Sequence, residues 1–125
     1  MLFAKRVFLV AGVYGLIVIL LGFVALIGGP EDWTANHPEY AIGFFATAFA
    51  WQVAFLVIST DPVRYRLLMI AAILEKIPYA VAIVLLYSMS KVSQTIFGFG
   101  LIDGLLGALF AYAYLATGRA GARTS

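Results

Sequence analysis

Two adjacent ionisable residues, Glu75 and Lys76, lie near the middle of an apolar stretch that is long enough to cross a lipid bilayer. Because hydrocarbon offers a charge no water, an ionisable side chain at that depth is expensive to insert and usually faces a partner or a wet cavity inside a helix bundle. A carboxyl and an amine placed there can bind a polar atom of a ligand, exchange a proton or fasten two helices together. This pair is therefore the first candidate for a functional site.

Gln52 and Asp103 lie at similar depths in two other apolar stretches. With a rise of about 1.5 Å per residue, Glu75 and Lys76 lie roughly 12 to 14 Å from one end of their helix, Gln52 about 10 Å from the same side, and Asp103 about 10 Å from the opposite side. In an apolar layer about 30 Å thick, all four can meet near the midplane. We therefore predict a ligand-binding or proton-binding cluster of Gln52, Glu75, Lys76 and Asp103.

The formal charges of this cluster do not cancel. With one lysine and two acids, one carboxylate is in surplus, so we expect either Glu75 or Asp103 to hold a proton near neutral pH. The alternative is that the cluster only fastens helices. Interhelical hydrogen bonds in membranes average about 0.6 kcal/mol, which is small against the roughly 2.5 to 3.5 kcal/mol that each charged residue costs to insert. This imbalance favours a function.

Pro78 predicts a kink beside Glu75, because proline has no N–H to donate to the carbonyl of Leu74.

The composition is that of an integral membrane protein. The chain has 125 residues, of which 64% are hydrophobic and 11% charged, with a mean hydropathy of +1.03. It has no cysteine and a single histidine, His37, so it lacks the ligands of thiolate and multi-histidine metal sites. We therefore expect no metal and no cofactor. The net charge of +2 gives no sign of a nucleic acid partner.

Four apolar segments must position the cluster. Each has about the 20 residues that a helix needs to cross a bilayer core, and they are Val7–Ile27, Tyr40–Ser59, Leu67–Tyr87 and Ile96–Thr117. Short loops make consecutive helices antiparallel neighbours. The sequence therefore predicts an all-α fold with one domain over residues 1–125, an up-and-down bundle of four transmembrane helices.

Lysine and arginine are distributed unequally between the two sides of this predicted bundle. Lys91 alone falls on one side and Lys76 lies within a span. The other positive residues share the opposite side: Lys5, Arg6, Arg64, Arg66, Arg119 and Arg123. By the positive-inside rule, both termini should be cytoplasmic. Such a bias also favours a parallel over an inverted arrangement in any homo-oligomer.

Small residues recur every fourth position in three of the spans. Gly100 and Gly104 do so in the last span, Ala46, Ala50 and Ala54 in the second, and Ala11 and Gly15 in the first. Small residues let helix backbones approach closely in membranes. We interpret these stripes as intramolecular packing faces of the bundle.

The turn between the second and third spans carries a second candidate site. Thr60 or Asp61 can cap the following helix, and Pro62 suits its first turn. Arg64 and Arg66 satisfy the positive-inside rule and are also candidates for binding the anionic headgroup of a membrane lipid.

Part of the chain resembles a known group of proteins. The residues that carry the resemblance are Asp61, Pro62, Arg64, Tyr65, Arg66, Leu68, Met69, Glu75, Lys76, Tyr79 and Asp103. This pattern is similar to one in small uncharacterised bacterial membrane proteins of the DoxX-like group, over about residues 40–117. The resemblance implies a four-helix bundle in a bacterial inner membrane. It implies no activity that carries over residue by residue.

Three functions are compatible with these residues. The leading hypothesis is a non-catalytic or accessory protein that binds a lipid-like or apolar small molecule, because the cluster contains no recognisable catalytic nucleophile. The second is a proton-coupled small-molecule transporter in which Glu75 or Asp103 exchanges a proton for substrate. The third is an intramembrane acid–base isomerase or cyclase of a lipid, with Glu75 as acid and Asp103 as base.

Overall fold

In a computed structural model the chain forms four long helices. The structure describes the backbone of residues 2–28 and 38–124, and the side chains of residues 2–25 and 38–119. The helices are α1 (Leu2–Gly28), α2 (Pro38–Thr60), α3 (Leu68–Ser88) and α4 (Gln94–Thr124). Each contains a stretch long and apolar enough to cross a membrane. The predicted four-helix fold is confirmed. His37 lies outside the described residues.

Apolar side chains surround the helices instead of lining only one face. On α1, for example, Leu9, Val10 and Ile17 are each at least half exposed, although the helix also contributes buried residues to the core. A helix that is apolar all round is typical of a membrane span or of a fully buried helix. Here the exposed apolar side chains leave an extensive hydrophobic outer surface.

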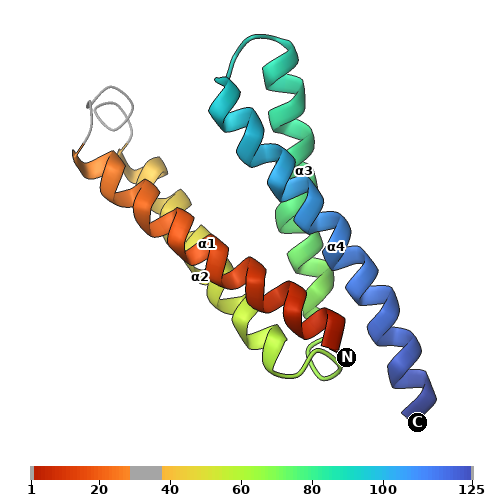
Figure 1. Cartoon of the computed structure of the whole chain (residues 1–125). Coiled ribbons are helices and arrows are strands. Elements are labelled where there is room, and N and C mark those ends of the chain that lie inside the picture. Colours follow the sequence, from red (N-terminus) through yellow and green to blue (C-terminus); the bar gives the residue numbers. More distant parts are fainter. Residues whose placement is uncertain (1, 29–37, 125) are drawn as a thin grey trace.

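The four helices are arranged as two antiparallel hairpins. Helix α1 packs along α2, and α3 packs along α4, whereas contacts between the hairpins are fewer and are made mainly by α1 with α4. Figure 1 shows that the hairpins converge at the turn formed by residues 61–67 and diverge toward the opposite end of the bundle. Both termini lie at the convergent end (Figure 1).

The convergent end contains the hydrophobic core. Its members come from all four helices and are Ala4, Phe8, Ala11, Phe55, Ile58, Met69, Ala72, Leu106, Phe110 and Ala113. Three fully buried phenylalanines lie at its centre: the ring of Phe8 stacks on that of Phe110 with centroids 4.3 Å apart, and Phe55 meets Phe110 edge-on at 4.9 Å. Such aromatic contacts add to the area that the rings bury, so this end of the bundle is closed.

Glycines allow the close packing of α3 against α4. A Cβ atom at Gly100 would lie 2.5 Å from the Ile83 side chain, and one at Gly107 would lie 2.5 Å from that of Ile77. The predicted packing face of α4 therefore lies within the chain. The alanine stripe of α2 behaves differently, because Ala46 and Ala50 are exposed. The prediction of intramolecular packing was wrong for these two alanines.

The turn between the hairpins differs from the predicted helix start. Asp61 Oδ1 accepts a hydrogen bond from the backbone N–H of Arg64 at 3.3 Å, while Thr60 Oγ1 donates to the carbonyl of Val57 at 2.6 Å. Helix α3 begins only at Leu68 and has no side-chain cap. The prediction that Thr60 or Asp61 caps this helix was wrong, because the carboxylate closes the turn before it.

Candidate functional site

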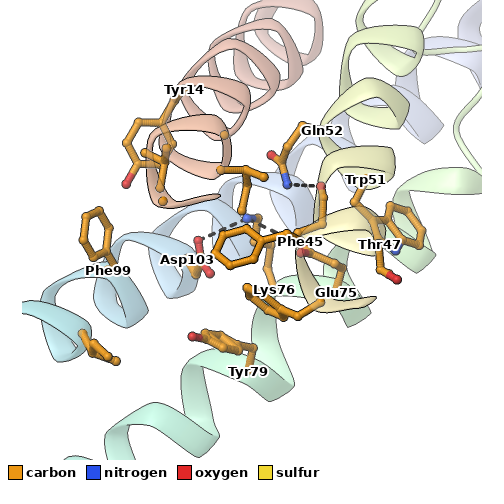
Figure 2. A pocket seen from close by; sticks show the side chains of 17 residues that line it. Tyr14, Phe45, Thr47, Trp51, Gln52, Glu75, Lys76, Tyr79, Phe99 and Asp103 are labelled. Carbon is orange, nitrogen blue, oxygen red and sulfur yellow. Dashed lines mark hydrogen bonds and ion pairs between the residues drawn. The ribbon is translucent and has the colours of Figure 1, made fainter. Parts of the chain in front are cut away.

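Three of the four predicted cluster residues lie together. Lys76 Nζ donates a hydrogen bond to Asp103 Oδ1 at 3.1 Å and lies 3.5 Å from Glu75 Oε2 (Figure 2). Lys76 is 5% exposed, whereas the two carboxyl side chains are each about one fifth to one quarter exposed. The ammonium thus joins α3 to α4, and its charge is shared between two carboxyls.

The surroundings of Lys76 follow from how α3 and α4 pack. Gly107 lies close to the lysine stem, since a Cβ atom there would be 3.1 Å from the Cβ of Lys76. This close approach brings the lysine within reach of Asp103, one helical turn earlier on α4. On the core side, Nζ lies 5.4 Å from the centroid of the Phe55 ring, within the range of a cation–π contact. The cluster therefore lies directly above the closed core.

Gln52 lies beside the cluster but does not bond to it. Its Nε2 donates to the carbonyl of Ala48 at 2.9 Å, one turn back on its own helix. Gln52 is only 2% exposed, and its Oε1 has no hydrogen-bond partner. The amide lies against Gly15, where any Cβ atom would overlap it. All four polar residues therefore lie in the same part of the bundle, as expected, but Gln52 makes no bond to the other three.

A cavity opens between the two hairpins beside these polar groups. It has a volume of about 550 Å³, which is within the usual range of small-molecule sites. All four helices line it, with Tyr14, Gly15, Val18, Ile19, Gly22, Phe44, Phe45, Thr47, Ala48, Trp51, Gln52, Glu75, Lys76, Tyr79, Ile96, Phe99 and Asp103. We call this cavity the hairpin pocket. Its wall is mainly apolar and aromatic, and the polar cluster forms one part of it (Figure 2).

Two buried oxygen atoms of the hairpin pocket are hydrogen-bond acceptors without a donor. Glu75 Oε2 is buried without a hydrogen-bond partner, as is Gln52 Oε1. Leaving such buried atoms unpaired is unfavourable, so a ligand that donates to them gains binding energy. Pro78, inside α3, has no N–H to donate to the carbonyl of Leu74. Leu74 does not line the pocket, so this carbonyl is not counted among its acceptors.

Sequence reasoning did not identify the aromatic side chains of the pocket. Tyr79 was named only through the family resemblance, and Tyr14, Phe45, Trp51 and Phe99 were not singled out. Aromatic residues are common in apolar spans, so their types alone carry no signal. Their positions along the helices do carry a signal. Tyr14 is next to Gly15, which lies against Gln52, and Trp51 and Tyr79 lie within one helical turn of Gln52 and Glu75, respectively.

The two arginines of the turn have different surroundings. Arg66 Nε donates to the carbonyl of Tyr114 at 2.9 Å, and its guanidinium carbon lies 3.7 Å from the centroid of the Tyr114 ring. Gly118 allows this approach, because a Cβ atom there would lie 2.5 Å from the guanidinium. Arg64 is exposed. Arg66 thus fastens the turn to α4, and Arg64 is the more exposed of the two arginines.

Comparisons with known proteins gave no match: no protein-family model, no curated protein and no solved structure matches this chain. The resemblance to the DoxX-like group therefore stays a prediction. Among the residues that the structure describes, no group of histidine, cysteine, aspartate or glutamate side chains could hold a metal ion.

Proposed function

We propose that the chain is a multi-pass protein of a bacterial inner membrane, related to the DoxX-like group, with both termini in the cytoplasm. Two observations support this placement. The helices expose apolar side chains all round, and the convergent end, with the termini and the 61–67 turn, carries most of the positive residues. Lipid hydrocarbon covers such helix surfaces without cost, and the positive-inside rule orients them.

The proposed activity is the binding of a lipid-like or apolar small molecule between the two hairpins. The observation that carries it is the hairpin pocket, about 550 Å³ in volume, whose aromatic wall ends at buried polar atoms. Pockets of this kind recognise an apolar body by its shape and orient it by a few polar atoms. In this chain the orienting atoms belong to Gln52, Glu75 and Asp103. The protein then acts as a binding or accessory subunit.

A pair of matched variants tests this proposal. Val18 lines the hairpin pocket, whereas its neighbour Ile17 is 55% exposed and does not line it. We expect Val18→Trp to fill the pocket and Ile17→Trp to leave it open. Native mass spectrometry of the whole chain, extracted with its membrane lipids, should show a retained molecule in the wild type and in Ile17→Trp. At least a tenfold loss is expected in Val18→Trp. Equal retention in all three proteins would contradict the proposal.

Proton-coupled transport is the second candidate, and the arrangement of charges favours it over a lipid-modifying enzyme. Lys76 Nζ lies 3.1 Å from Asp103 Oδ1 and 3.5 Å from Glu75 Oε2, and this Glu75 oxygen makes no hydrogen bond beyond its ion pair with the lysine. A carboxyl in such a place can release a proton when a substrate enters. The test is substrate flux into proteoliposomes driven by a pH gradient. Flux that is unchanged by Glu75→Gln eliminates transport through this residue.

A further inference from the structure

The polar cluster of the hairpin pocket lacks positive charge and hydrogen-bond donors. Counted formally, Glu75 and Asp103 bring two negative charges and Lys76 one positive charge. The lysine ammonium already donates to Asp103, and it lies 3.5 Å from Glu75. An ammonium has three donors, whereas two carboxylates have four oxygens between them, so the carboxylate oxygens outnumber the donors of Lys76.

Two buried oxygen atoms show where hydrogen-bond donors are missing. Gln52 Oε1 and Glu75 Oε2 both lack a hydrogen-bond partner. Gln52 is 98% buried, so bulk water does not reach its amide freely. Its own Nε2 donates to the carbonyl of Ala48, so the amide oxygen, which lies against Gly15, is the group left without a hydrogen bond. The two atoms come from α2 and α3, and therefore from different hairpins.

Aromatic rings supply a second attraction for positive charge. Tyr14, Phe45, Trp51, Tyr79 and Phe99 come from all four helices and line the same pocket (Figure 2). The face of an aromatic ring is the negative end of its quadrupole and attracts cations within about 6 Å. The chain already makes such contacts, since the ammonium of Lys76 lies 5.4 Å from the centroid of the Phe55 ring and the guanidinium carbon of Arg66 lies 3.7 Å from that of Tyr114.

We propose that the ligand of the hairpin pocket is a lipophilic organic cation, an ammonium or similarly charged group on an apolar or aromatic body. This inference rests on the proposed binding function and narrows its ligand to one class. Such a ligand replaces the proton that the surplus carboxyl otherwise holds, and it places its charge among the aromatic rings. An anion of the same shape meets like charge instead, and a neutral ligand brings no positive charge to the cluster.

Two ions of matched shape and opposite charge test the proposal. Tetraphenylphosphonium and tetraphenylborate are titrated separately into the whole chain, reconstituted in nanodiscs of zwitterionic phosphatidylcholine, with empty nanodiscs subtracted. We expect the phosphonium to bind at least tenfold more tightly than the borate. This comparison uses the unaltered chain and so does not depend on the folding of any variant.

A carboxyl-to-amide pair then locates the charge that is recognised. Glu75→Gln should weaken phosphonium binding about tenfold and reduce the difference in affinity between the phosphonium and the borate. Asp61→Asn makes the same chemical change on the exposed turn outside the pocket, and it should change binding less than twofold.

Equal or tighter binding of the borate, or binding of neither ion, overturns the inference that the ligand is a cation. An unchanged phosphonium affinity in folded Glu75→Gln overturns it as well. The proposed binding function fails in a different way, when the extracted wild type retains no molecule that Val18→Trp loses. The two failures are therefore distinguishable.

Discussion

The two ends of this bundle are built from the same four helices and yet differ in kind. At the convergent end, Phe8, Phe55 and Phe110 are fully buried against one another. At the divergent end, the aromatic residues Phe44 and Phe99 remain 51% and 44% exposed and line a pocket. Because lipid is as apolar as these side chains, helices in a membrane associate through close packing and polar contacts and not through apolarity itself. Rings from both hairpins pack against one another at the closed end, whereas the ring contacts Phe23–Phe45 and Tyr87–Phe97 at the open end each stay within one hairpin.

The polar cluster lies at the boundary between the two ends. Lys76 contacts the core through Phe55 on one side and faces the hairpin pocket on the other. Its bonds run to Asp103 on α4 and toward Glu75 on α3, so they hold one hairpin together and do not bridge the two. Between the hairpins, Lys76 makes its contact with the Phe55 ring of the core.

The largest loss of stability should come from removing an aromatic ring of the closed core, and this change tests the difference between the two ends. Phe110→Ala leaves a cavity beside Phe8 and Phe55, and large-to-small changes at fully buried phenylalanines cost about 3 to 5 kcal/mol in soluble proteins. The matched change Phe99→Ala at the open end should cost less than about 1 kcal/mol, since this ring is 44% exposed. Unfolding in mixed micelles measures both. Similar losses of unfolding free energy in Phe110→Ala and Phe99→Ala would show that the two ends are equally packed.

A loss of about 3 kcal/mol is expected for Lys76→Met, because the change leaves two carboxyls beside each other without their shared partner. The double variant Lys76→Met with Glu75→Gln should recover part of this loss, since fewer charges are then left unpaired. The same unfolding assay compares them. Single and double variants of equal stability would contradict the pairing.

A smaller effect, about 1 kcal/mol, is expected for Arg66→Lys at the turn. Lysine cannot reproduce the Nε bond to the Tyr114 carbonyl together with the stacked guanidinium. Arg64→Lys should change stability by less than about 0.5 kcal/mol, because Arg64 is exposed. Thermal unfolding of the two variants measures this difference between Arg66 and Arg64. An equal shift of the unfolding temperature in both variants would contradict the structural role of Arg66.

The parts of the fold that could be predicted depend on local properties. Hydropathy located the four helices, because a backbone in hydrocarbon must satisfy its own hydrogen bonds and so forms long apolar helices. The depths of Glu75, Lys76 and Asp103 followed from the rise per residue. The helices nevertheless extend past the predicted spans, from Leu2 in α1 and to Thr124 in α4, because helical hydrogen bonding continues where hydropathy falls.

Two features that the sequence did not reveal depend on which helix lies opposite: the exposed face of Ala46 and Ala50, and the attachment of Arg66 to Tyr114. Residue type and spacing are the same whichever neighbour a helix has. These two features therefore became visible only once the helices were packed. Two errors are local, because Gln52 bonds back to Ala48 and Asp61 bonds to Arg64 within the turn.

The sequence by itself determined four helices of membrane-spanning length and the depth of every polar residue along them, because apolarity and helical rise are properties of each segment alone. Only the tertiary structure decided that the helices pair as two hairpins, that these diverge above the core, and that Tyr14, Trp51 and Phe99 surround the cluster. The physical reason is that apolarity does not select a neighbour among apolar helices. That choice rests on the fit of glycines, rings and a single lysine across them.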